Sequence, residues 1–131
     1  MGTGDSMFDA TFAPALAALD ATPSRDSHAY AALVREIGED GAGEVRAVFW
    51  SDTCARLELF RTLVLEEHRA RIGREAHSLK GTARTFGYVR LAALALHLET
   101  RADALGDAAF RDLLQQMDTA FADAKAQDLD D

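Results

Sequence analysis

The sequence predicts an all-α protein: an up-down antiparallel four-helix bundle with an additional N-terminal helical segment. Its 131 residues include 26 Ala and 16 Leu but only 5 Val and 2 Ile. Unbranched side chains lose little rotamer freedom in a helix, whereas β-branched ones favour sheets. Both prolines, Pro14 and Pro23, lie near the N-terminus, so the rest of the chain lacks the strongest helix breaker. The composition therefore argues against nucleotide-binding enzymes built on Val/Ile-rich parallel sheets.

Charge and cysteine content exclude several further classes. The net charge of −8 argues against non-specific binding of nucleic acid or of an anionic membrane surface. No apolar run approaches the roughly 20 residues that span a bilayer, and no secretory leader is visible. Cys54 is the only cysteine, which rules out an internal disulfide or a Cys-based zinc site. We expect a cytoplasmic protein in which Cys54 is a small buried helix residue.

The chain divides into an N-terminal extension over 1–23, a helical bundle over 24–126 and an acidic tail over 127–131. Within the extension, Met7–Leu19 is apolar and Ala-rich but is interrupted by Pro14. We expect this stretch to form a short helical or irregular segment packed on the outside of the bundle.

The first two helices of the bundle are expected at 27–37 and 44–65. Ser24 or Ser27 would cap the first, and Gly38 would end it. Two glycines within 39–43 favour a loop there. The second helix carries a series of apolar residues: Val45, Val48, Phe49, Leu59, Phe60 and Leu63.

Three more amphipathic helices follow. The helix expected at 68–86 has one apolar stripe, made of Ile72, Ala76, Leu79, Ala83 and Phe86, and Gly87 ends it. The helix at 88–105 places Leu91, Leu94, Ala95 and Leu98 on one side. The last, after Gly106, carries Phe110, Leu113, Leu114, Met117, Ala120 and Phe121. Because the connections are short, neighbouring helices are predicted to be antiparallel.

One histidine stands out on the third of these helices. Gly73 and Gly81 lie four residues before and after His77, so all three share a helix face. An interior glycine costs about 1 kcal/mol relative to alanine, and two of them beside one imidazole suggest that the ring must stay accessible to something large. Lys80 and Arg84 lie on the same face, away from the apolar stripe.

Basic residues are concentrated around His77. Residues 69–90 contain six Arg or Lys and one acid, a local charge of +5, so the rest of the chain carries −13. Arg74, three residues before His77, borders the face. A cationic strip around an exposed imidazole on an acidic protein predicts a site for an anion. A neutral imidazole nitrogen is a nucleophile, and a nearby ammonium stabilises phosphoryl oxygens, so the pattern points to phosphoryl transfer.

The sequence His77-Ser78-Leu79-Lys80-Gly81 resembles the core motif of histidine-containing phosphotransfer (HPt) domains of two-component phosphorelays. Ala76–Gly81 and the second glycine, Gly87, match the family pattern without a gap, and the resemblance spans roughly 28–125. Thr85–Tyr88 is most similar to the phosphoacceptor domain of chemotaxis histidine kinases. Phe49 falls where the family has an aromatic residue on the preceding helix.

Two positions depart from this pattern. Glu67-His68 stands where the family usually has a Gly-Asp-like pair, which leaves the start of the acceptor helix open. Arg84-Thr85 replaces a common Ala-Asn pair.

The resemblance implies that His77 accepts the phosphoryl group, that Lys80 assists electrostatically and that Gly81 opens the face to a partner. It also implies that Glu99 hydrogen-bonds the other ring nitrogen of His77. Spacing is consistent with this role, because His77 lies ten residues before Gly87 and Glu99 twelve after it, at similar heights in an antiparallel hairpin. Alternatively, Glu99 is a surface residue that pairs with Arg101 or Lys80.

We therefore expect a monomeric phosphocarrier without kinase activity or a cofactor of its own. A response-regulator receiver domain, or a sensor or hybrid histidine kinase, would dock over Gly73, Arg74, Gly81 and Arg84, and the partner would supply Mg²⁺. A metal-binding bundle is disfavoured, since no histidine follows a Glu by three residues. His97 is expected to be packed or partly exposed. The alternative function is a non-catalytic helical adaptor that binds a signalling partner while His77 stays unphosphorylated.

Overall fold

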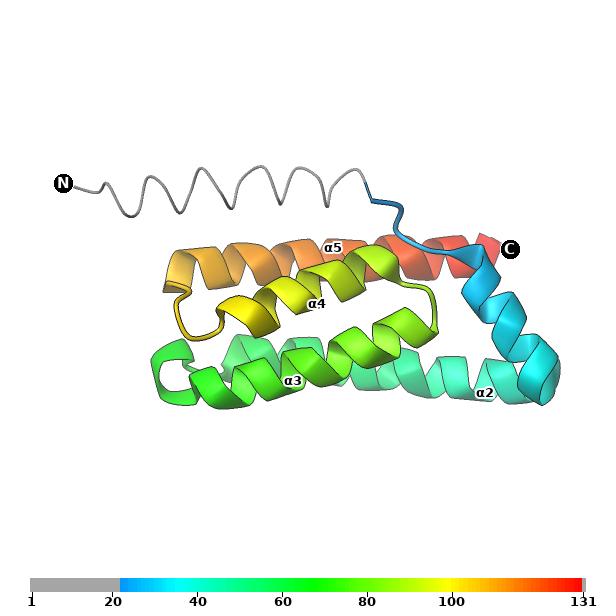
Figure 1. Ribbon diagram of the computed structural model, residues 1–131, viewed down its shortest axis with the longest axis horizontal. Helices are drawn as coiled ribbons and strands as arrows, with labels where there is room; N and C mark the ends of the chain where they lie inside the picture. The colour runs from blue at the N-terminus through cyan, green and yellow to red at the C-terminus, as the bar shows by residue number, and fades with distance from the viewer. Residues whose placement is uncertain (1–21, 131) are drawn as a thin grey trace.

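A computed structural model describes residues 22–130, which form four helices. These are α2 (Ser27–Thr62), α3 (Leu65–Thr85), α4 (Val89–Arg101) and α5 (Asp107–Asp130). Successive helices run in opposite directions, with α3 beside α4 and with α2 and α5 behind them (Figure 1). The predicted all-α bundle is confirmed. The helical segment expected in the N-terminal extension lies outside the described residues.

Helix α2 differs from the two helices and loop expected over 27–65. Its N-cap is Asp26, whose side chain accepts a hydrogen bond from the His28 N–H at 3.0 Å, and not Ser24 or Ser27. Gly38 (φ +83°) breaks the helix as predicted, but the chain resumes helical structure at once. The loop prediction for 39–43 was wrong because Ala42 is fully buried, and such packing outweighs the low helix propensity of the glycines around it.

The connection between α2 and α3 is two residues long. Leu63 and Val64 are extended, and α3 begins at Leu65, three residues before the predicted start. Leu65 is buried in the core and anchors the first turn of α3, which the sequence did not predict to be helical. Residues 127–130, expected as an acidic tail, continue α5.

The predicted apolar stripes of α3, α4 and α5 form the core. Their buried members are Ile72, Ala76, Leu79, Ala83, Phe86, Leu91, Leu94, Ala95, Leu98, Phe110, Leu113, Leu114, Met117, Ala120 and Phe121. From α2, Phe49 stacks on Phe86 with ring centroids 4.5 Å apart. Val45 and Val48, in contrast, are exposed, because the buried side of α2 runs through Ala42 and Phe49 instead.

A buried polar network joins the start of the described chain to the end of α5. Asp128 is almost fully buried and accepts a hydrogen bond from the Tyr88 hydroxyl, which itself accepts one from Trp50 Nε1 at 2.7 Å. Arg25 Nη1 lies 3.1 Å from Asp128 Oδ1, and Arg46 lies further out at 3.9 Å. Burial, followed by the bond to Asp128, raises the pKa of the Tyr88 phenol. These contacts hold the first described residues against the C-terminal turn of α5.

Replacing Thr53 with Val is expected to raise the free energy of unfolding by about 1 kcal/mol, because a buried hydroxyl without a hydrogen bond is costly. Thr53 is fully buried in α2, and its Oγ1 has no hydrogen-bond partner among the described residues. Urea unfolding measures the change. Thr62→Val is the control, since the Thr62 hydroxyl is exposed and already bonds Leu59. A loss of stability in Thr53→Val would contradict this interpretation.

Candidate functional site

His77 lies in the middle of α3 on the side opposite the core. Ala76 and Leu79 are fully buried, whereas 66% of the His77 side chain is exposed. The apolar stripe therefore fixes the rotation of α3, and that rotation turns the imidazole to solvent.

Glu99 of α4 connects His77 to Lys80. Its Oε2 lies 2.6 Å from His77 Nδ1, and its Oε1 accepts a hydrogen bond from Lys80 Nζ, also at 2.6 Å. The hydrogen bond to His77 and the pairing with Lys80, alternatives in the sequence, are thus both present. Lys80 is largely covered, with 14% of its side chain exposed. The three side chains form one hydrogen-bonded group, which we call the acceptor trio.

The charge on Glu99 fixes the orientation of the imidazole. The hydrogen bond from Lys80, and then that from His77, lower the pKa of the Glu99 carboxyl, so it is ionised at neutral pH. A carboxylate can only accept hydrogen bonds, so Nδ1 of a neutral His77 carries the proton. Nε2 then has the free lone pair, and no described residue bonds to it. The nucleophilic nitrogen is the exposed one.

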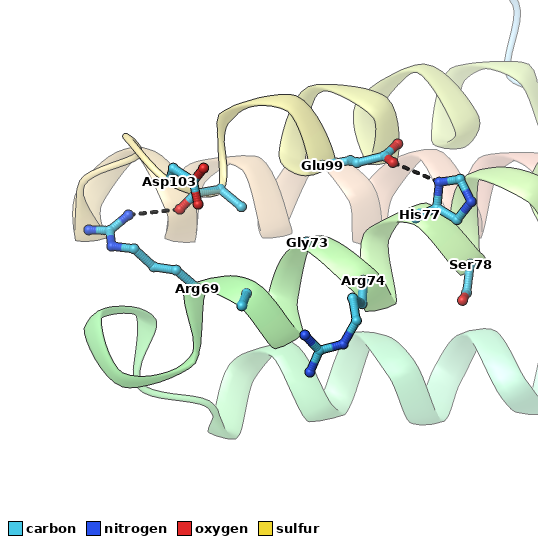
Figure 2. A pocket seen from close by; sticks show the side chains of 9 residues that line it. Arg69, Gly73, Arg74, His77, Ser78, Glu99 and Asp103 are labelled. Atoms are coloured by element: carbon cyan, nitrogen blue, oxygen red, sulfur yellow. Dashed lines mark hydrogen bonds and ion pairs between the residues drawn. The ribbon is translucent and has the colours of Figure 1, made fainter.

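A groove extends from the acceptor trio along the seam between α3 and α4. Its volume is about 610 Å³, and it is lined by Arg69, Ala70, Gly73, Arg74, His77, Ser78, Glu99, Ala102 and Asp103. Figure 2 shows His77 and Glu99 at one end and Arg69 with Asp103 at the other. Arg69 supports the far end by donating hydrogen bonds to the carbonyls of Ala102 and Leu105 at 2.9 and 2.7 Å.

Neither glycine beside His77 is required by internal packing. A Cβ built on Gly81 meets no atom within 4 Å, and one built on Gly73 meets only the Ala102 Cβ at 3.6 Å, an ordinary contact. Alanine would therefore fit at both positions and favour the helix. Gly81 leaves open space on the face that carries His77, and Gly73 lines the groove beside it.

The remaining predicted site residues lie nearby without touching the acceptor trio. Arg74 and Arg84 are exposed and form no ion pair within the described part of the chain. Figure 2 shows the Arg74 guanidinium directed away from His77, towards α2.

The sequence did not reveal the contribution of Arg69 or Asp103 to the groove, since neither belongs to a recognisable motif.

Two further predictions from the sequence concern the burial of single side chains. Cys54 is exposed, so its expected burial was wrong: it lies beside buried Thr53, on the solvent side of α2. His97 is partly buried, as expected, and burial lowers its pKa.

Residues 22–130 contain neither a metal-binding cluster nor a membrane-spanning helix. No group of three or more His, Cys, Asp or Glu side chains there is placed to hold a metal ion. None of the four described helices is long and apolar enough to cross a membrane.

Comparison with known families identifies the class of protein that this helical bundle and its exposed histidine define. The Hpt domain family matches residues 44–127, which include all of the acceptor trio. The chain belongs to the Hpt domain family. Hpt domains are the phosphocarriers of two-component signalling, and they interact with receiver domains and histidine kinases. No curated protein and no solved structure showed significant similarity to the chain.

Proposed function

We propose that the protein is a histidine phosphotransfer protein that accepts a phosphoryl group on Nε2 of His77 and passes it to a response-regulator receiver domain. The donor is the aspartyl phosphate of a receiver domain or a histidine kinase. The observation that carries this proposal is the acceptor trio: Nδ1 is held by Glu99 while Nε2 is exposed and without a partner among residues 22–130.

The transfer step needs no base to remove a proton. The Nε2 lone pair of neutral His77 attacks phosphorus, an N–P bond forms, and the P–O bond to the aspartate breaks as the carboxylate leaves with its electron pair. The ring becomes cationic because Nδ1 keeps its proton. Glu99 stabilises that cation through the hydrogen bond already present at 2.6 Å. The partner is proposed to supply Mg²⁺, which neutralises charge on the phosphoryl oxygens.

Lys80 is proposed to act through Glu99. Its ammonium donates to Glu99 Oε1 and is mostly covered, so in the resting protein it orients the carboxylate. Glu99 therefore has one oxygen for each partner, and the imidazole is held in place before the donor arrives.

The docking surface is proposed to include Gly73, Arg74, Gly81 and Arg84. The open space over Gly81 gives a partner close access to His77, and Gly73 lines the groove next to the imidazole. The exposed arginines provide positive charge for an acidic partner surface, where complementary charge accelerates encounter.

Phosphotransfer from a purified receiver domain tests the proposed function. The protein is incubated with a receiver carrying a radiolabelled aspartyl phosphate and Mg²⁺, and the two chains are then separated. We expect label on this chain that is lost in acid, survives base and maps to the peptide containing His77. No transfer from any receiver or kinase of the host, or an acid-stable label, would instead favour the non-catalytic adaptor.

Glu99→Gln is expected to lower the rate of phosphotransfer about 10- to 100-fold. The amide can still accept from Nδ1, but it no longer stabilises the cationic ring of the transfer step. Rapid-quench kinetics measure the rate, and ¹⁵N NMR of the imidazole reports the tautomer. Glu58→Gln removes an exposed carboxylate of α2 and serves as the control. An unchanged rate and tautomer in Glu99→Gln would exclude the role assigned to Glu99.

Gly81→Ala is expected to stabilise the protein and impair its function. Helix propensity predicts a gain of up to about 1 kcal/mol in the free energy of unfolding. The added methyl would occupy the open space beside His77, and we expect transfer from a receiver to slow about tenfold. Urea unfolding and transfer kinetics on the same sample separate the two effects. A variant that is more stable and transfers at the parent rate would remove Gly81 from the docking surface.

A further inference from the structure

Helix α2 exposes three large aliphatic side chains in a row. Ile37, Val45 and Val48 are 48%, 40% and 57% exposed, and we call them the α2 stripe. The Ile37 side chain lies over Gly41, where an added Cβ would be 3.4 Å from Ile37 Cγ1. Val45 and Val48 follow one and two turns further along. Such a row on a small charged domain indicates a surface that something else covers.

The α2 stripe borders the acceptor helix. Arg56 lies eleven residues, or about three turns, after Val45 and therefore on the same side of α2. Its Nε is 2.9 Å from Oε1 of Glu75, two residues before His77 on α3. The opposite flank of α2, which carries Arg46, faces α5 through Asp128.

Residues 7–19 have the composition to cover this surface. Phe8, Phe12, Leu16 and Leu19 follow one another at intervals of four, four and three residues, a spacing that gathers apolar side chains on one side of a segment. We propose that this segment binds in cis to the α2 stripe, with Phe8 and Phe12 as its anchors. Pro14 does not prevent this, since the two anchors both precede it.

The point at which the described chain begins allows the contact. The Arg90 guanidinium donates to the Thr22 carbonyl at 2.8 Å, and the Asp26 N–H donates to the Gly87 carbonyl at 2.6 Å, which fixes the chain beside the α3–α4 connection. Phe12 precedes Thr22 by ten residues. Ten residues can span about 33 Å, more than the width of two neighbouring helices with axes about 10 Å apart.

The size of the α2 stripe favours a tethered segment over a second copy of the chain. A stable interface between separate proteins buries at least about 1,000 Å², more than three aliphatic side chains provide. A tethered segment instead has an effective concentration on the order of millimolar, at which weak contacts are sufficient.

Paramagnetic broadening in the full-length protein tests the proposal. Cys54 is the only cysteine, is exposed on α2 and lies six residues, or about 9 Å along the axis, beyond Val48. With a nitroxide on Cys54, we expect the amide signals of residues 7–19 to broaden and to recover when the nitroxide is reduced. Unaffected signals would overturn the proposal. A sample that mixes ¹⁵N-labelled chains with separate nitroxide-carrying chains should show no broadening, and broadening there would assign the contact to a second copy.

Serine substitutions identify the surface that is bound. The double variant Val45→Ser/Val48→Ser is expected to lose the broadening, because it removes the apolar contact while both positions stay solvent-exposed. Val64→Ser is the matched control, since Val64 is 54% exposed between α2 and α3, at the other end of the bundle. Broadening that persists in the double variant, or that disappears in the control as well, would overturn the assignment to the α2 stripe.

Discussion

A His77→Gln variant is expected to accept no phosphoryl group while it keeps the fold and stability of the parent chain. Glutamine can still bond to Glu99, but its amide nitrogen has no nucleophilic lone pair, so the N–P bond cannot form. Because 66% of the His77 side chain is exposed and it contributes nothing to the core, the free energy of unfolding should change by less than about 0.5 kcal/mol. We expect no detectable label on His77→Gln. This corresponds to a rate of phosphotransfer at least about 1,000-fold lower, as is typical when a nucleophile is removed.

His28→Gln provides the matched control for this experiment. His28 is also exposed on a helix, but it lies in the first turn of α2, away from Glu99. Label should be retained in His28→Gln and absent from His77→Gln when both receive phosphate from the same receiver. Equal labelling of the two variants would show that another residue is the acceptor.

A Gly87→Ala variant is expected to lose about 3 kcal/mol of unfolding free energy. Gly87 has φ +75°, which costs an L-residue about 1–2 kcal/mol. The added Cβ would also lie 2.4 Å from the Asp26 carbonyl oxygen and 2.7 Å from the Ala29 Cβ. Both contacts would have to open, which adds the cost of overpacking, about 1–3 kcal/mol. The short hydrogen bond from the Asp26 N–H to the Gly87 carbonyl would be weakened as well.

Urea unfolding measures this loss as a lower midpoint with an unchanged slope. Gly106→Ala is the control, because Gly106 also lies in a connection between helices but has no atom within 4 Å of a built Cβ and no positive φ. Its stability should change by less than about 1 kcal/mol, the cost of replacing glycine by alanine at the N-cap of α5. A Gly87→Ala variant as stable as the parent would mean that the segment of residues 22–26 does not pack against Gly87 in solution.

Periodicity predicted the parts of the fold that depend on burial along a single helix. The stripe from Ile72 to Phe86 fixed which side of α3 faces the core, and the position of His77 on the other side followed from it. The family resemblance implied the hydrogen bond between His77 and Glu99, and the nearly equal distances of the two residues from Gly87 along the sequence agreed with it. The rotation of α3 thus follows from helix periodicity, whereas the partner of His77 followed from the resemblance.

Features that depend on contacts between distant segments could not be predicted in this way. The helical structure of 39–43 requires the burial of Ala42 against the bundle, which overrides local propensity. Asp128 looked like part of a solvated acidic tail, but Tyr88 and Arg25, about 40 and 100 residues earlier, bury it. Likewise, the burial of Lys80 against Glu99 depends on how closely α3 and α4 approach each other. That distance cannot be predicted from the spacing of apolar residues within either helix.

The ion pair between Arg25 and Asp128 also has a topological consequence. It places the first described residues and the last turn of α5 at the same end of the bundle (Figure 1). Ends that lie this close can be joined by a short linker, and new termini can be opened between the exposed residues Gly106 and Asp107, where α5 begins. The acceptor trio lies entirely on α3 and α4 and would not be divided. Chain order is therefore separable from function here: a circular permutant that begins with α5 keeps every contact on which His77 depends.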